Sequence, residues 1–336
     1  MAKLAIVILN WNGQKYLSQF LPALVEYAPA YSEIVIADNA STDNSVAFIK
    51  ENFPQIKIIQ NHENTGFARG YNLALQQVEA EYYCLLNSDV LVTEHWVEPI
   101  IELLDNEPNV AAVQPKMLSC SDKTQFEYAG ACGGFIDRLG YPFCRGRVFS
   151  HLEEDENQYD NAIEVFWATG AALFVRSHVF HEVNGLDDDF FAHMEEIDFC
   201  WRVKRLGYTI KVEPKSVVYH VGGGTLPKNS AQKTYLNFRN NLFLLLKNLP
   251  ENKLLPVFLI RFHLDHIAAL FFLFQGHIKD TWAVYRAQLS FLRQWRKMKR
   301  KRKEINEETY RQTFQKSIVF EHYIKKKTKF NGVNLK

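Results

Sequence analysis

The sequence predicts an α/β protein with a mainly parallel β-sheet flanked by helices, followed by a helical C-terminal extension. Over the first 120 residues, short runs rich in β-branched residues alternate with helix-like stretches, which is the pattern of parallel strands joined by helices. Beyond about Tyr235 these runs stop and the pattern becomes helical. A chain of 336 residues is long enough to bury a large core.

The expected strands and helices alternate along the first half of the chain. We expect strands over residues 4–9, 33–37, 56–59 and 82–86. We expect helices over residues 17–27, 45–52, 70–77 and 94–106. Residues 114–175 are richer in glycine and aromatic residues, which predicts irregular structure and added strands beside the sheet.

Polar residues follow three of the expected strands, at residues 10–13, 38–43 and 87–89. In open α/β sheets the ligand crevice lies outside the carboxyl ends of the strands, so these side chains point to one crevice. The chain contains no G-x-G-x-x-G and no G-x-x-x-x-G-K-[ST] motif. A dinucleotide fold or an ATPase-type phosphate loop is therefore unsupported.

Composition favours a folded globular protein in a reducing compartment. Hydrophobic residues make up 47% of the chain and charged residues 23%. The five cysteines form no C-x-x-C pair, so neither a disulfide framework nor a zinc ribbon is indicated. The N-terminal apolar run covers only residues 4–9, which is too short for a signal-peptide core. We therefore expect a cytoplasmic location.

Asn87-Ser88-Asp89 stands at the end of the apolar run at residues 82–86. A carboxylate placed where a buried strand stops is costly unless a metal ion or the polar groups of a ligand compensate it. Asp89 is therefore a candidate site residue. The alternative is that Asp89 caps the next turn through local backbone hydrogen bonds.

Two further loops offer groups that suit a nucleotide. Asp38, at the end of the second strand, could accept the N3–H of a uracil or thymine base, or it could only build a tight turn before a capped helix. The loop at residues 64–72 opens a helix whose free N–H groups suit a diphosphate, and Arg69 adds a positive charge. Gly66 and Gly70 could instead serve turn geometry and packing alone.

Acidic residues return at Glu195, Glu196 and Asp198, flanked by aromatic and aliphatic side chains. Apolar surroundings raise carboxyl pKa values, as a general base working near neutral pH requires. Ordinary helix capping is the alternative, because the helix dipole favours acids in the first turn. His220 ends an apolar run and could bind a divalent cation beside a carboxylate, or serve as a hydrogen-bonded core residue.

Read in order, these motifs resemble the motif series of family 2 glycosyltransferases, and most closely the bacterial rhamnosyltransferase-like branch of surface-polysaccharide assembly. The resemblance covers residues 3–245. The segments that carry it are residues 7–13, 38–45, 64–72, 86–89 and 195–198, together with His220.

The resemblance implies a GT-A fold, an inverting mechanism, a UDP- or dTDP-linked sugar donor, and Mg²⁺ or Mn²⁺ as cofactor. By this likeness Asp38 contacts the base, and Arg69 lies near the nucleotide. Asp89 and His220 hold the metal, and Glu196 is the catalytic base. The other implied residues are Asn10, Asn12, Asn39, Asn64, Gly66, Asn87 and Ser88 for the nucleotide, and Trp167 and Gly170 for the acceptor.

The sequence departs from the commoner family pattern in two places. Asn87 stands where the D-x-D segment has its first Asp, so only one carboxylate of that segment can hold the ion, and His220 becomes more important. Glu195-Glu196 stands where many relatives have Glu-Asp. The base therefore stays open among Glu195, Glu196 and Asp198.

The implied organisation is a catalytic domain over residues 1–235, with a nucleotide-binding half at 1–115 and an acceptor half at 116–235, and an extension over residues 236–336. Residues 254–274 of the extension are nearly all apolar. Arg261, His263, Asp265 and His266 interrupt this run, and each central charge costs about 2.5–3.5 kcal/mol on insertion scales, so a membrane span is disfavoured. Arg261 and Asp265 could pair, leaving an apolar face suited to a membrane interface.

The basic run at residues 293–303 would add about 1 kcal/mol of attraction to anionic lipid per cation. We expect peripheral contact with the inner face of the cytoplasmic membrane, where a lipid-linked acceptor would be found. The alternatives are helices packed on the catalytic domain or a homodimer interface. No nucleic-acid partner is expected, because nothing else in the sequence resembles such a module.

Two other functions fit parts of the sequence. A nucleotidyltransferase shares the sheet and the metal, but it would carry a Gly-rich basic loop after the first strand, which residues 10–14 lack. A sugar-binding or scaffold protein without turnover is conceivable because of Asn87.

Overall fold

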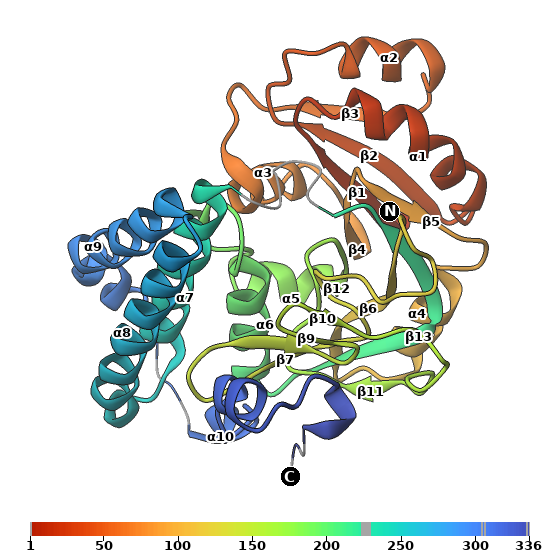
Figure 1. The fold of residues 1–336 in the computed structure, drawn as a ribbon. Helices are drawn as coiled ribbons and strands as arrows, with labels where there is room; N and C mark the ends of the chain where they lie inside the picture. Colours follow the sequence, from red (N-terminus) through yellow and green to blue (C-terminus); the bar gives the residue numbers. More distant parts are fainter. Residues whose placement is uncertain (1, 223–229, 304, 306, 334, 336) are drawn as a thin grey trace.

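The computed structural model describes residues 2–222, 230–303, 305, 307–333 and 335, and its centre is a nine-stranded mixed sheet (Figure 1). The strand order is β11-β13-β6-β12-β4-β1-β2-β3, and β5 pairs with β13. The pairs β1/β2, β1/β4, β2/β3 and β6/β13 are parallel, whereas β12 runs antiparallel between β4 and β6. The predicted α/β class with a mainly parallel sheet is confirmed.

The bounds of the elements agree with most of the predictions. The sheet contains β1 (Ala2–Asn10), β2 (Ser32–Asp38), β3 (Lys57–Gln60), β4 (Ala80–Asn87), β5 (Val90–Val92), β6 (Val110–Ser119), β11 (Ile163–Glu164), β12 (Ala172–Arg176) and β13 (Thr209–His220). The helices beside it are α1 (Gln14–Tyr27), α2 (Ser45–Asn52), α3 (Gly66–Leu75), α4 (Glu98–Asn106), α5 (Ser177–Glu182) and α6 (Glu195–Arg205).

Three helix starts differ from the prediction: α1 begins at Gln14 and not at residue 17, and two others differ for local reasons. Helix α3 begins at Gly66 and not at residue 70, because the Asn64 side chain accepts a hydrogen bond from the Gly66 N–H at 3.0 Å and supports an earlier first turn. Helix α4 begins at Glu98 and not at residue 94, because His95 adopts a φ of 58°, which is outside the helical region.

Alternate residues of β1 pack on opposite faces of the sheet, as the two-residue period of a strand requires. Leu4, Ile6 and Ile8 belong to one core cluster, with buried residues of α1, α2 and α4. Ala5 and Val7 belong to a second cluster, with buried residues of α3 and α6 and of the C-terminal helices. The two helix layers therefore hold the strand ends in place from both sides.

Residues 114–175 contain the added strands that were predicted. A four-stranded sheet comprises β7 (Gly134–Ile136), β8 (Pro142–Cys144), β9 (Arg147–Val148) and β10 (His151–Leu152). The same segment also supplies the end of β6 and the start of β12 to the central sheet, which the expectation of irregular structure missed. All five cysteines are free thiols.

The C-terminal extension is helical, as predicted. It comprises α7 (Ala231–Asn248), α8 (Glu251–Phe274), α9 (Ile278–Arg300) and α10 (Glu307–Arg311), with short irregular helices at Phe320–Ile324 and Phe330–Gly332. Figure 1 shows α7, α8 and α9 together on the flank away from α1 and α2. The predicted Arg261–Asp265 pair is present and buried, at 3.2 Å. Among the described residues, α8 is the one helix long and apolar enough to cross a membrane.

Candidate active site

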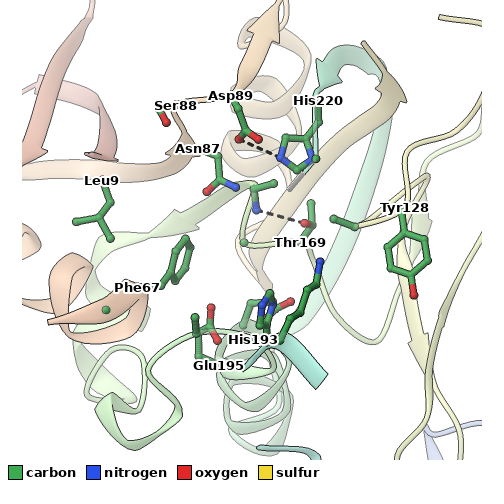
Figure 2. Close-up of a pocket in the computed structure, with 18 of the residues that line it drawn as sticks. Leu9, Phe67, Asn87, Ser88, Asp89, Tyr128, Thr169, His193, Glu195 and His220 are labelled. Atoms are coloured by element: carbon green, nitrogen blue, oxygen red, sulfur yellow. Dashed lines mark hydrogen bonds and ion pairs between the residues drawn. The ribbon is translucent and has the colours of Figure 1, made fainter. Parts of the chain in front are cut away.

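A cavity of about 700 Å³ opens where the carboxyl ends of β1, β4 and β13 face the start of α6. Figure 2 shows Asp89 and His220 on one side of it, and His193 and Glu195 on the other. The predicted site residues on its wall are Asn39, Asn64, Gly66, Asn87, Ser88, Asp89, Gly170, Glu195, Glu196 and His220. The structure thus brings together residues from both halves of the predicted catalytic domain.

Strand register joins Asp89 to His220. Asp89 lies between β4 and β5, and His220 is the last residue of β13. Because β5 pairs antiparallel with β13, His220 lies opposite Val90. His220 Nε2 is consequently 3.1 Å from Asp89 Oδ1, in a position where the His220 and Asp89 side chains are 5% and 8% exposed.

Glu127 is a member of this cluster that the sequence analysis missed. Its Oε1 lies 3.3 Å from His220 Nδ1, and it also lines the cavity. Burial alone lowers the pKa of His220, but the charges of Glu127 and Asp89 outweigh it and raise the pKa to about 10. The imidazole is therefore protonated at neutral pH here. A signal was available, since Glu127 is a lone carboxylate between two aromatic residues, Phe126 and Tyr128.

Asp89 and His220 fit one part of a metal shell. The described part of the chain contains no group of three or more His, Cys, Asp or Glu side chains arranged to hold an ion. The two side chains offer one oxygen and one nitrogen donor on the cavity wall. Such a pair suits a divalent ion that takes its other ligands from a diphosphate and water and displaces the imidazole proton.

Glu195 and Glu196 open α6 on the opposite wall. The Oε2 atom of each is buried without a hydrogen-bond partner among the described residues. Burial raises the pKa of Glu196 to about 7. Burial and repulsion from Glu196 raise the pKa of Glu195 well above its usual range. A carboxyl group that ionises near neutral pH has the pKa that a general base needs.

The loop that leads into this glutamate pair has unusual backbone geometry. Phe191, His193 and Met194 have φ angles of 66°, 70° and 71°. Each non-glycine residue in this region costs about 1–3 kcal/mol, so the geometry persists only where neighbouring groups hold it. The loop turns the chain so that α6 starts at the cavity.

Asn240 of α7 holds this loop from outside. Its Nδ2 atom lies 2.9, 2.8 and 2.7 Å from the carbonyl oxygens of Phe190, Ala192 and His193. On the other side, the carbonyl oxygen of Phe191 accepts a hydrogen bond at 2.7 Å from a backbone N–H in the first turn of α3. The loop is fixed between the C-terminal helices and the donor-side helix.

Asp198 does not reach the cavity wall. Its Oδ2 accepts hydrogen bonds from Lys247 at 2.7 Å and Arg202 at 2.8 Å, and its Oδ1 accepts one from Asn248 at 2.9 Å. Burial alone raises the pKa of Asp198, but the two cations hold it well below its usual range. Asp198 fastens α6 to α7, which leaves Glu195 and Glu196 as the predicted carboxylates that face the cavity from α6.

On the donor side, Asn39 and Asn64 form part of the wall and bind each other. Asn39 Nδ2 donates to Asn64 Oδ1 at 2.9 Å and to the Gly66 carbonyl oxygen at 3.1 Å. Gly66 has a φ of 80°, and a Cβ there would lie 2.5 Å from the Phe191 ring. A glycine is therefore required where α3 meets the loop before α6.

Three predicted nucleotide ligands lie off the described wall of this cavity. Asn10 Nδ2 donates to Asp38 Oδ1 at 3.0 Å, and Asp38 Oδ2 accepts from the Ser41 N–H at 3.1 Å. Asn12 Oδ1 accepts from the Thr42 N–H at 2.7 Å. In this structure Asn10, Asn12 and Asp38 tie the loops after β1 and β2 together.

Arg69 and Trp167 are also placed away from the cavity. Arg69 is exposed on α3. Trp167 is 3% exposed, and its Nε1 donates to the Phe135 carbonyl oxygen at 2.8 Å. Its ring packs so closely on Gly134 that a Cβ there would lie 2.1 Å away. The ring belongs to the core, while Gly170 reaches the cavity.

Solved structures share this fold. A structure of S. aureus TarS matches with a TM-score of 0.54 at 15% identity, covering 89% of this chain and 90% of that one. The mannosyltransferase PcManGT from Pyrobaculum calidifontis, in complex with GDP-Man and Mn²⁺, matches with a TM-score of 0.53 at 13% identity, covering 86% and 87%. The implied GT-A fold is confirmed.

The chain belongs to glycosyl transferase family 2, whose model matches residues 5–172. It is 22% identical over 233 residues to the N-acetylglucosaminyl-diphospho-decaprenol L-rhamnosyltransferase of Mycobacterium tuberculosis, covering 65% of this chain and 75% of the relative. It is 23% identical over 244 residues to the low-salt glycan biosynthesis hexosyltransferase Agl10 of Haloferax volcanii, covering 70% and 73%. The expected family and the rhamnosyltransferase-like resemblance are confirmed.

Proposed function

We propose that this glycosyltransferase inverts the anomeric centre of a UDP- or dTDP-linked sugar and passes the sugar to a hydroxyl group of a saccharide or lipid-linked acceptor. The observation that carries the proposal is the pair of glutamates, each with a buried Oε2 atom, across the cavity from Asp89 and His220. A base on one wall and metal ligands on the other leave room between them for the donor sugar and the attacking hydroxyl.

In this proposal Glu196 takes the proton of the acceptor hydroxyl as the oxygen attacks the anomeric carbon in a single displacement. The bond from that carbon to the diphosphate breaks, and the nucleoside diphosphate leaves. Glu195 is the alternative base, and burial and repulsion from Glu196 raise its pKa well above the usual range. The raised pKa makes Glu196 basic enough to accept the proton near pH 7.

Asp89 and His220 would hold Mg²⁺ or Mn²⁺, which offsets the charge that develops on the departing diphosphate when it is bound. The geometry of this pair supports the assignment, as does the Mn²⁺ named in the structures of PcManGT and GalNAc-T7. Glu127 would orient His220 by binding its other ring nitrogen.

Asn39, Asn64, Gly66, Asn87 and Ser88 are proposed to contact the nucleotide, since they line the donor side of the cavity. Asn10, Asn12 and Asp38 would lie behind these residues and fix the loops that form the cavity wall. On the acceptor side, Gly170 keeps the space open, because a Cβ there would lie 3.3 Å from Phe67 and 3.5 Å from Glu196.

We also propose that the protein works at the inner face of the cytoplasmic membrane as a peripheral protein. Two features support this. The relative in M. tuberculosis is named for a decaprenol-linked acceptor, and α8 exposes many large apolar side chains. A homodimer that covers the same helix is the competing use of this face.

The proposal is tested by thermal shift and by product release. UDP-, dTDP- and GDP-linked sugars are added with and without Mn²⁺, and we expect a UDP or dTDP compound with Mn²⁺ to raise the melting temperature. Asp89→Ala should abolish that shift, whereas Glu196→Gln should keep the shift and lose release of nucleoside diphosphate. The control is Glu81→Gln, an exposed carboxylate on β4. No shift with any nucleotide would refute the proposal.

A further inference from the structure

The exposed surface of α8 is mostly apolar from residue 254 to residue 274, and the exposed polar side chains His263 and His266 interrupt it. We use "outer face" for five of its side chains, namely Leu255, Leu259, Ile267, Phe271 and Phe274. These are 70%, 56%, 60%, 57% and 87% exposed. Between residues 254 and 274 the only charged side chains are Arg261 and Asp265, and both are buried against the protein. An exposed apolar stripe of this length is unusual for a surface that faces water.

The opposite side of α8 is fastened to the catalytic domain by its one buried charge pair. Arg261 Nη1 donates to the Leu139 carbonyl oxygen at 2.7 Å, and the guanidinium lies 4.0 Å from the centre of the Tyr141 ring. Crossing a bilayer would strip this pair of those contacts and place two charges in hydrocarbon. The helix is therefore suited to lie along a surface, with only the outer face in contact with it.

The neighbouring helix α9 supplies positive charge beside the apolar stripe. Arg293 and Arg296 are exposed, and no carboxylate in the described part of the chain pairs with them. By contrast, Lys297 binds Asp189 at 2.5 Å and Lys301 binds the same residue at 2.6 Å, so part of the basic run holds α9 to the loop before α6.

The exposed arginines of α9 favour one of two partners for the outer face, which are a second copy of the chain and an anionic bilayer. A two-fold dimer built through α8 and α9 would bring this patch against itself, and the two carboxylates between residues 254 and 300, Asp265 and Asp280, are already bonded to Arg261 and Thr234. An anionic bilayer offers apolar depth to the rings and negative headgroups to the arginines. The bilayer complements both features of the surface, whereas a second copy complements only the apolar one.

The hairpin formed by α8 and α9 also contacts the rim of the active-site cavity. Thr234 of α7 lines the cavity, and its hydroxyl donates to Asp280 Oδ1 in the first turn of α9 at 2.6 Å. Phe274 and Ile278, which are 87% and 57% exposed, flank the short turn between α8 and α9 just before that contact. Figure 1 shows this turn at the same end of the bundle as the start of α7.

We infer that the outer face of α8, with the exposed arginines of α9, binds the interfacial region of an anionic lipid bilayer and so sets the α7 rim of the cavity at the membrane. The acceptor class is then a membrane-resident, lipid-linked saccharide that enters past Thr234. The identification of the acceptor rests on the proposed function, whereas the binding surface does not.

The first test is co-sedimentation of the full chain with vesicles of equal parts phosphatidylglycerol and phosphatidylethanolamine, and with vesicles of phosphatidylcholine alone. We expect binding to the anionic vesicles that weakens as salt is added. The double variant Phe271→Ser/Phe274→Ser should lose about tenfold or more in vesicle affinity, because two inserted rings are removed. Phe320→Ser is the matched control, since its ring is also 50% exposed but lies outside the hairpin.

The second test concerns the cations. Arg293→Glu/Arg296→Glu should weaken binding to the anionic vesicles and flatten its salt dependence, whereas Lys15→Glu, an exposed cation on α1, should do neither. Trp282 gives a direct signal because it is 64% exposed beside the same turn. Its emission should shift to the blue on vesicle addition, and Trp282→Phe should remove that shift.

Three results would overturn the inference. They are vesicle binding that none of these variants changes, a dimer in sedimentation velocity that Phe271→Ser/Phe274→Ser converts to monomer, and membrane association that resists carbonate extraction. The nucleotide thermal shift should be the same in all of these variants. If the wild type shows no nucleotide shift but binds vesicles, the proposed glycosyl transfer fails and the membrane surface stands.

Discussion

The loops on the two sides of the cavity are held in different ways. On the donor side, the loops after β1, β2 and β3 bond to one another through Asn10, Asp38 and Asn39, and one buried atom, Asn10 Oδ1, has no partner among the described residues. On the catalytic side, the loop before α6 contains three strained residues and is held by Asn240 of the C-terminal helices. The loops on the donor side therefore hold one another in place. The loop beside the proposed base is held by a side chain of α7, which comes much later in the sequence.

The difference teaches that helix α7 of the C-terminal extension helps to build the candidate active site. The predicted boundary at residue 235 falls inside α7 (Ala231–Asn248), and Leu242 to Leu246 pack in the same core cluster as Tyr71 and Trp201. In the loops of the donor side Asn10 Oδ1 is buried without a partner among the described residues, and on the catalytic side one atom each of Glu195, Glu196 and His193 is. Unsatisfied groups are costly to bury, which is expected where a substrate is to bind.

The largest expected effect comes from the catalytic side. Glu196→Gln should lower kcat by about 10²–10⁴-fold, the usual contribution of a general base. Binding of the nucleotide, measured by thermal shift, should stay within a few-fold of wild type because the donor side is untouched. Glu195→Gln tests the alternative base, and the variant with the larger kcat loss identifies the base. Equal activity in Glu196→Gln, Glu195→Gln and the control Glu81→Gln would contradict the assignment.

Sequence patterns predicted the strands of the donor side better than the side-chain contacts on either side of the cavity. The strands, the polar strand ends and Asp89 follow from residue patterns within short windows, because a parallel sheet aligns the ends of its strands. The partnership of Asp89 with His220 depends on β5 pairing with β13, which no local pattern specifies. The family resemblance supplied that link.

Local sequence patterns did not predict the contacts between distant segments. Asn240 reads as a polar residue in an amphipathic helix, and nothing in its neighbours shows that it faces three carbonyl oxygens. Trp167 and Asp198 have the residue types of an acceptor platform and a base, yet tertiary packing buries the first and pairs the second with Lys247. Side-chain direction, which depends on the whole fold, decided these cases.

A second prediction tests the support that Asn240 of α7 gives to the loop before α6. Asn240→Ala removes the donor that faces the strained loop, so we expect kcat to fall about 10–100-fold through misplacement of the glutamates. Loss of the buried hydrogen bonds should cost about 1–3 kcal/mol of stability. The KM for the nucleotide-sugar should change little. Leu244→Ala, a fully buried position on the same helix, controls for instability alone; a matching kcat loss there would show that Asn240 has no specific positioning role.

The donor side should respond in the opposite sense. Asn39→Ala removes the bonds to Asn64 and Gly66 and should raise the KM for the nucleotide-sugar about 3–10-fold, as expected for one or two neutral hydrogen bonds. The kcat should stay within about twofold of wild type, because the proposed base is held from α7. Steady-state kinetics of Asn39→Ala and Asn240→Ala side by side check the contrast. A shared kcat defect would mean that the two sides of the cavity are held as one unit.

The smallest expected effect is on stability and follows from the raised pKa of Glu196. In the unfolded chain this carboxyl ionises near its usual value of 4.5, whereas in the folded protein it keeps its proton until about pH 7. Between these values the folded state binds more protons than the unfolded state, so raising the pH destabilises the wild type. Glu196→Gln cannot ionise and escapes this loss. Its melting temperature relative to wild type should therefore rise from pH 4.5 toward pH 7 and then level off, as measured by calorimetry in a series of buffers.

Glu81→Gln, whose carboxylate is exposed, should show no such trend. A pH-independent difference for Glu196→Gln would mean that the glutamate is ionised and compensated in the folded protein, and the contrast between a largely satisfied donor side and an unsatisfied catalytic side would no longer hold.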